Sequence, residues 1–124
     1  MEPNWGDNQP IYRQLRDRVV AMILEGTLKE GDPLPSVRSV AADYQINPLT
    51  VLKGYQALVD EELVEKHRGL GMFVKDGARR LLMKRERELF LKTDWPLSVQ
   101  GIMRLDLEVK ELLKFVDDGK RSKS

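Results

Sequence analysis

The chain has 124 residues, of which 41% are hydrophobic and 33% are charged, enough for one compact domain with a small appendage. A net charge of +1 is too small to indicate nucleic-acid binding by itself, so such a function must depend on where the basic residues lie. The absence of cysteine excludes disulfides and thiolate metal sites.

No targeting or membrane segment is visible in the sequence. The first residues, Met1 to Trp5, lack the basic region and apolar core of a secretory signal. No apolar run approaches the roughly 20 residues that a membrane span requires. We therefore expect a cytoplasmic protein with no membrane partner.

A first helix is predicted between Pro10 and Gly26. Its apolar residues recur at helical spacing, and Gly26 is typical of a helix end. Residues 1–9, which precede it, are polar and contain proline and glycine, so we expect a flexible N-terminal arm. In the loop or short strand that follows the helix, Leu28 and Leu34 are expected to anchor the chain in the core.

Two short helices with strong N-caps are predicted next. Ser36 caps the first, which ends near Tyr44. Asn47 caps the second, which begins with Pro48 and runs to about Asp60. The second helix should bury one face and expose the other. The expected buried residues are Val51, Gly54, Tyr55 and Leu58, and the expected exposed residues are Leu49, Thr50, Lys53 and Gln56.

The order of these two helices suits DNA recognition, because the second can enter a major groove with its first turn against the base edges. Thr50 can bond to a base or a phosphate, and Leu49 can touch a thymine methyl group. Lys53, one turn later, can reach a phosphate or a guanine. Arg38 lies near the N-terminus of its helix, where a positive charge does not stabilise the helix dipole. A basic residue at this position is better explained by binding of an external anion. The alternative for the second helix is an ordinary core helix with a well-made cap. The alternative for Arg38 is a solvated surface charge.

A basic, glycine-rich hairpin follows, with a turn over residues 67–71. Arg68 suits a narrow minor groove, and Gly69 lets the turn lie close to a nucleic-acid backbone. His67 is a candidate phosphate contact and not a metal ligand, because the chain has no second histidine and no cysteine. The alternative is a simple surface turn. The two predicted strands are residues 63–66 and 72–75.

The region from 77 to 117 predicts short amphipathic helices: one over 78–92, a break at Asp94-Trp95-Pro96, and segments over 97–105 and 107–116. Such helices cannot form a sizeable core alone, so we expect them to pack against a second copy of the chain. The alternative is packing on the same chain's N-terminal domain. The candidate dimerisation residues are Leu81, Leu82, Leu89, Phe90, Trp95, Leu97, Ile102, Met103, Leu105, Leu112, Leu113 and Val116.

The expected fold class is therefore mainly α with a small β wing. The expected organisation is a flexible arm over 1–9, a winged helix-turn-helix domain over 10–76, a helical dimerisation region over 77–117, and a disordered tail over 118–124.

Residues 10–74 resemble the winged helix-turn-helix domain of the GntR family of bacterial transcription regulators. The motifs are Leu34-Pro35-Ser36-Val37-Arg38-Ser39-Val40-Ala41, Asn47-Pro48-Leu49-Thr50-Val51 with Tyr55 and Leu58, and Arg68-Gly69-Leu70-Gly71-Met72-Phe73-Val74. The resemblance implies DNA contacts by Ser36, Arg38, Asn47, Pro48, Leu49, Thr50, Lys53, Arg68 and Gly69.

Two residues depart from the family pattern. Gly54 stands where the family usually has Ala, which permits closer packing against the first helix. Glu62 stands where it usually has Gly, and a left-handed backbone there would cost about 1–2 kcal/mol.

The short region after Val74 resembles the YtrA-like branch of this family, whose small helical tail serves dimerisation. That resemblance implies a homodimeric repressor that binds a palindromic double-stranded operator, of an operon that often encodes an ABC-type transporter and the regulator itself. The resemblance implies no cofactor, and it leaves the small-molecule effector unknown. An alternative is a winged-helix module that binds protein, or DNA without sequence preference. We expect no enzyme activity, because the sequence has no nucleophile–base pair, metal cluster or phosphate-binding loop.

Overall fold

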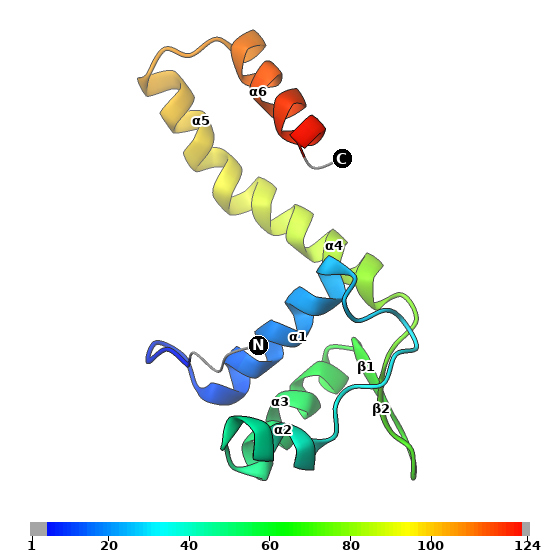
Figure 1. The fold of residues 1–124 in the computed structure, drawn as a ribbon. Coiled ribbons are helices and arrows are strands. Elements are labelled where there is room, and N and C mark those ends of the chain that lie inside the picture. Colours follow the sequence, from blue (N-terminus) through cyan, green and yellow to red (C-terminus); the bar gives the residue numbers. More distant parts are fainter. Residues whose placement is uncertain (1–4, 123–124) are drawn as a thin grey trace. The chain divides into compact units, whose positions relative to one another are not determined.

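The computed structural model describes residues 5–122, which divide into two compact units between Lys84 and Arg85 (Figure 1). The helices are α1 (Ile11–Glu25), α2 (Val37–Tyr44), α3 (Pro48–Asp60), α4 (Ala78–Leu89), the π-helical η1 (Phe90–Asp94), α5 (Trp95–Arg104) and α6 (Val109–Ser122). The strands are β1 (Val64–His67) and β2 (Gly71–Val74). The predicted fold class, mainly α with a small β wing, is confirmed.

The ends of the first three helices follow the predicted caps. The Ser36 hydroxyl accepts a hydrogen bond from the Ser39 amide at 3.0 Å, and the Asn47 side chain accepts one from the Leu49 amide at 2.8 Å. Gly26 ends α1 with a left-handed backbone, at a φ of 87°. Each cap satisfies backbone groups that have no partner within the helix.

The hairpin pairs its strands antiparallel, from Val64 opposite Val74 to His67 opposite Gly71. Each strand lies one residue closer to the turn than predicted, because the turn takes only residues 68–70. The segment before α2 extends this small sheet. Its Leu34 amide donates to the Met72 carbonyl at 2.8 Å.

The core of the first unit forms where α1, α2, α3, the hairpin and the start of α4 meet. The predicted buried face of α3 is confirmed, and Leu28 and Leu34 are buried as predicted. The buried apolar residues are Leu15, Val19, Val20, Ile23, Leu28, Leu34, Val40, Ala41, Val51, Tyr55, Leu58, Leu63, Val64, Val74, Ala78 and Leu82.

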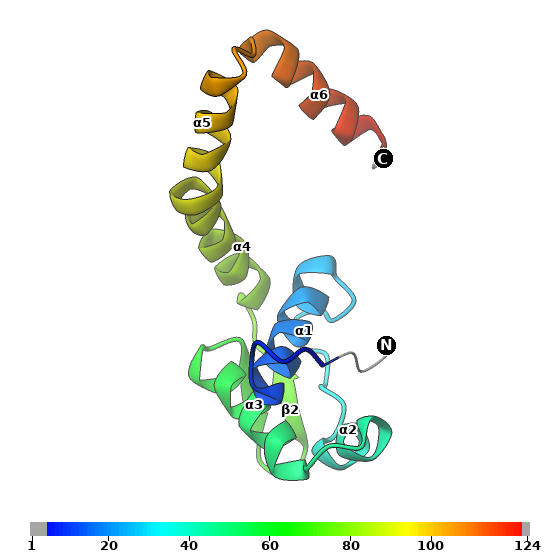
Figure 2. The same ribbon diagram turned by 90° about the vertical axis from the view of Figure 1, so that its left-hand side faces the viewer.

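Helix α1 lies against α3 (Figure 2), and Gly54 is the point of closest approach. A Cβ added there would lie 3.0 Å from the carbonyl oxygen of Tyr12 on α1. The closer packing that the sequence suggested is therefore present. The other departure, Glu62, has a φ of 63°, so it does adopt the left-handed conformation that costs a non-glycine residue about 1–2 kcal/mol.

The boundary of the first unit differs from the predicted one at residue 76. Leu82 is only 2% exposed and belongs to the core of this unit, while Leu81 packs against that core. The assignment of Leu82 to dimerisation is therefore wrong, whereas Leu81 is only partly buried and its assignment stays a prediction. The start of α4 buries its apolar side within its own chain, where Ala78 and Leu82 belong to the core cluster.

Residues 5–9 of the predicted flexible arm contact the first unit, and residues 1–4 lie outside the described part of the chain. The ring of Trp5 meets Tyr44 edge-on, with 6.2 Å between centroids, and the Arg18 guanidinium lies 4.4 Å from the centre of the Trp5 ring. The Gly6 amide and carbonyl each hydrogen bond to the side chain of Gln14 at 2.8 Å. These contacts hold this part of the arm on α1 and α2.

The second unit is helical throughout, apart from the turn between α5 and α6, and two predictions made for it are wrong. Pro96 does not break the helix, because the wider π-helical turn accommodates it: the Trp95 amide donates to the Phe90 carbonyl, five residues back. Residues 118–122 continue α6 and are not a disordered tail, and residues 123–124 lie outside the described part. Glu111 in the first turn of α6 and Lys120 in its last turn favour the helix dipole.

No side chain of the second unit is fully buried within residues 85–121, the part for which side-chain exposure is described. Helices α5 and α6 diverge from the turn that joins them (Figures 1 and 2). None of the helices in residues 5–122 combines the length and hydropathy that crossing a membrane would require.

Candidate nucleic-acid interface

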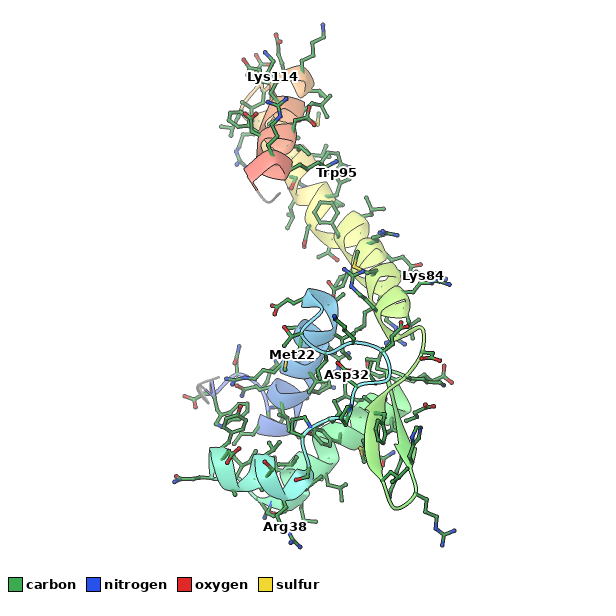
Figure 3. The ribbon with its side chains drawn as sticks, turned by 45° about the vertical axis from the view of Figure 1, so that its right-hand side comes forward. Met22, Asp32, Arg38, Lys84, Trp95 and Lys114 are labelled. Carbon is green, nitrogen blue, oxygen red and sulfur yellow. The ribbon has the colours of Figure 1, made fainter. Side chains whose placement is uncertain are left out.

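The predicted recognition residues on α2 and α3 lie on an exposed part of the first unit. Leu49, in the first turn of α3, is 72% exposed, and Thr50 beside it is half-buried. Arg38 extends outward from α2, away from the body of the unit (Figure 3). The tip of the hairpin reaches the same end of this unit as α2 (Figures 1 and 3). The fold thus brings the two predicted recognition elements to the same end of the first unit.

At the start of α3, side chains are more available to a ligand than the backbone amides are. Pro48 has no amide hydrogen, the Leu49 amide donates to the Asn47 side chain, and the Thr50 amide donates to the Asn47 carbonyl at 2.9 Å. Asn47 therefore stabilises the helix end itself. Contacts with an anion or a base edge would come from the side chains of Thr50 and Leu49 and from Arg38 on the helix before.

Lys53 lies apart from these residues. Its ammonium group lies 4.3 Å from the centre of the Tyr12 ring on α1, a cation–π contact that holds the side chain beside that helix. The Ser36 oxygen accepts the capping hydrogen bond of α2, which leaves its hydroxyl hydrogen able to donate. Of the predicted contacts on the two helices, Arg38, Pro48, Leu49 and Thr50 have no described side-chain interaction that a partner would displace.

The hairpin tip is a tight turn of Arg68, Gly69 and Leu70. The Leu70 amide donates to the His67 carbonyl at 2.9 Å, and Gly69 has a φ of 81°, a conformation that favours glycine. Arg68 is exposed at this tip. His67 is held back on the strand, because its ring stacks on Phe73 with 4.6 Å between centroids.

The His67 ring also makes a polar contact within the hairpin. Its Nε2 lies 3.0 Å from a carboxylate oxygen of Glu65, so the predicted phosphate contact would compete with this pair. Within the described residues, no group of three or more histidine and carboxylate side chains could hold a metal ion.

A hollow of about 300 Å³ separates the hairpin from α2 and α3. Sequence reasoning did not single out three residues on its walls, Leu52, Lys66 and Leu70, because each looks like an ordinary surface position when read alone. The fold of the hairpin brings Lys66 and Leu70 to the same hollow as Leu52 of α3. The lining residues are Leu34, Pro35, Ser36, Val37, Leu52, Tyr55, Lys66, Leu70, Gly71 and Met72.

Two internal contacts fix this surface on the core. The Tyr55 hydroxyl donates to the Pro35 carbonyl at 2.7 Å and so ties α3 to the start of α2. Burial of the Tyr55 phenol raises its pKa to about 12. Arg16 on α1 donates through two nitrogens to the carboxylate of Glu61 at the end of α3, and these hydrogen bonds raise the pKa of Arg16.

Comparison with known proteins assigns this geometry to one family. Residues 11–74 match the family described as bacterial regulatory proteins, gntR family. The transcriptional repressor YtrA of Bacillus subtilis is 32% identical over 119 residues, which cover 91% of this chain and 92% of the relative. The repressor MngR of Escherichia coli, of the mannosyl-D-glycerate transport and metabolism system, is 33% identical over 69 residues, which cover 56% of this chain but only 29% of MngR.

Solved structures give the same result. A protein from Bacteroides thetaiotaomicron, described as a transcriptional regulator of the GntR family, superposes with a TM-score of 0.70 at 32% identity and covers 92% of this chain and 99% of its own. YtrA from Sulfolobus acidocaldarius, described as a GntR-family transcription factor, superposes with a TM-score of 0.58 at 33% identity and covers 74% of this chain and 97% of its own.

Proposed function

The chain belongs to the GntR family of bacterial regulatory proteins, and from this premise we propose that it is a homodimeric repressor of transcription. It acts in the cytoplasm on a palindromic operator, with α3 in a major groove and the hairpin in the adjacent minor groove. The observation that carries this proposal is the placement of Arg38, the first turn of α3 and the Arg68 tip at one end of the first unit.

The chemistry of this surface suits DNA. Arg38 and Arg68 supply cations at two points, one for each side of a phosphate backbone that separates two grooves. Leu49 is an exposed apolar group next to Thr50, a hydroxyl that can donate or accept. A thymine methyl group and a neighbouring base edge are suitable partners for such a pair.

The second unit supports the dimer. About 40 residues cannot bury enough apolar surface to be stable alone, and within residues 85–121 no side chain is fully buried. A second copy would cover the exposed groups of α5 and α6. The proposed contact residues, now without Leu82, are Leu81, Leu89, Phe90, Trp95, Leu97, Ile102, Met103, Leu105, Leu112, Leu113 and Val116.

A two-fold dimer presents two recognition helices related by symmetry, so its operator should be a palindrome. The similarity to YtrA over most of both chains supports repression as the outcome of binding. The resemblance to the YtrA-like branch further supports control of an operon that encodes an ABC-type transporter together with the regulator.

The dimer is tested by removing residues 85–124 and measuring the mass in solution by sedimentation. We expect a dimer for the full chain and a folded monomer for residues 1–84, because the cut leaves Ala78 and Leu82 in the core. A cut before residue 78 would remove both and destabilise the first unit, so it serves as the contrast. A monomeric full chain, or a truncated chain that remains a dimer, would reject the role of the second unit.

Operator recognition is tested by footprinting the DNA upstream of the chain's own gene. We expect two protected half-sites with centres separated by about one helical turn, or a multiple of it. Substitution of Thr50 or Leu49 should change the preference at one base pair in each half-site by about 1–3 kcal/mol. Weak binding without sequence preference would favour the alternative, a winged module that contacts protein or DNA of any sequence.

A further inference from the structure

An exposed leucine stands at the tip of the hairpin. Leu70 is 75% exposed, although burial of its apolar surface would be favourable. Its amide donates to the His67 carbonyl at 2.9 Å and so closes the turn, and its neighbours Gly69 and Gly71 adopt the positive φ values, 81° and 104°, that this turn requires. The hairpin therefore presents an apolar group to solvent from a defined position.

The surroundings of Leu70 are cationic and open. Arg68 belongs to the same three-residue turn, Lys66 precedes it, and residues 66–71 include no acidic side chain. A Cβ built on Gly69 or Gly71 would meet no atom within 4 Å, so the backbone on both sides of Leu70 is bare. An apolar side chain that follows two cations on a bare turn fits the groove of a nucleic acid better than the surface of a protein partner.

We propose that Leu70 makes the hairpin selective for base pairs that lack the guanine 2-amino group in the minor groove. The inference rests on the proposed function, in which the hairpin enters that groove. An A·T pair presents only acceptors there, and a G·C pair adds the amino donor. Arg68 can donate to the acceptors, whereas the isobutyl group of Leu70 cannot accept a hydrogen bond from an amino group that it covers.

The difference between the base pairs follows from desolvation. When the turn lies on a G·C pair, Leu70 removes water from the amino group and replaces it with no acceptor, which is unfavourable. On an A·T pair the same side chain fills space where no donor is present. Leu70 thus contributes selectivity, and Arg68 contributes attraction.

The test uses the full chain and operator duplexes in which one base pair of each half-site, scanned across the outer flanks, is A·T, G·C or inosine·C. Inosine lacks the 2-amino group but keeps the major-groove edge of guanine. At the position that the hairpin contacts, we expect G·C to raise the Kd about tenfold over A·T. Inosine·C should return the Kd to within about twofold of A·T, because only the amino group has been removed.

Variants separate Leu70 from its neighbours. Leu70→Ala should reduce the G·C penalty from about tenfold to about twofold, as the amino group regains water. Leu70→Asn should reduce it further, because the amide oxygen accepts from the amino group. Leu49→Ala is the matched control: it removes an equally exposed leucine from α3 and should weaken binding to all three duplexes alike.

The outcomes distinguish this inference from the proposed function. Absence of sequence-specific binding to every duplex would overturn the function itself. Specific binding in which inosine·C is as weak as G·C would overturn the role of the amino group. A tenfold penalty that persists in Leu70→Ala would assign the discrimination to Arg68 and groove width, and not to Leu70.

Discussion

Replacing Gly54 with alanine should destabilise the first unit, although alanine is the better helix former. The added Cβ would lie 3.0 Å from the Tyr12 carbonyl oxygen and 3.3 Å from the Leu15 Cδ2. Contacts between carbon and carbonyl oxygen ordinarily begin at about 3.3 Å. The Leu15 side chain can rotate, but the Tyr12 oxygen belongs to the backbone of α1, so the two helices must separate by a few tenths of an ångström.

The magnitude follows from two opposing effects. Alanine in a helix interior gains about 1 kcal/mol over glycine, and insertion of a carbon into a well-packed core costs about 1–3 kcal/mol. The net loss for Gly54→Ala should therefore be about 1 kcal/mol. Gly54→Val adds two more carbons to the same contact and should lose about 3 kcal/mol.

Urea denaturation followed by circular dichroism, at one fixed protein concentration, gives the free energy of unfolding for each variant. Ala57→Gly on the same helix is the control, because it reverses the change in helix propensity without adding an atom and should cost about 1 kcal/mol. If Gly54→Ala instead stabilises the protein by about 1 kcal/mol, α1 and α3 are not as close at this position as described.

Three further substitutions test other parts of the structure. Arg38→Ala should weaken operator binding about tenfold or more in a gel-shift titration and leave the unfolding free energy unchanged; unchanged affinity would remove Arg38 from the interface. Leu82→Ala should lower the unfolding free energy by about 2–5 kcal/mol, whereas a loss of dimer mass alone would return Leu82 to the second unit. Burial raises the pKa of Tyr55 from 10.0 to about 12, so its contribution to stability is complete below pH 10 and is lost as the pH rises to about 12. Tyr55→Phe should lower the unfolding free energy by about 1 kcal/mol at neutral pH and lessen its decline at alkaline pH. An identical alkaline decline in both proteins would contradict the assignment of this decline to the Tyr55 phenol.

Local chemistry explains what the sequence could predict. Ser36, Asn47 and Gly26 each act on backbone groups a few residues away, so their effect is visible in a short stretch of sequence. The same holds for the buried face of α3, whose period is that of a single helix. The fold of the first unit and the exposed positions of Arg38 and Leu49 follow from these signals.

The errors concern contacts between distant residues. Periodicity predicts that Leu82 is buried but does not show which residues cover it. In the structure it is covered by the core of its own chain. Trp5 has no periodic companion, so its contact with Tyr44 leaves no pattern to find. The contact of Lys53 with Tyr12 on α1 also has no periodic signal, and the DNA contact predicted for Lys53 stays a prediction. Pro96 predicted a break because the wider turn that accommodates it has no simple sequence signal.

The two tryptophans of the chain stand in different units, with Trp5 between Tyr44 and Arg18 in the first and Trp95, which is 45% exposed, in the second. Each unit therefore carries one tryptophan, whose emission can be excited selectively over that of tyrosine. In a Trp95→Phe variant the emission reports only the docking of the N-terminal arm. In a Trp5→Phe variant it reports only the environment of α5. The response of the first unit to operator DNA and the response of the second unit to protein concentration can thus be followed as separate fluorescence signals in unlabelled protein.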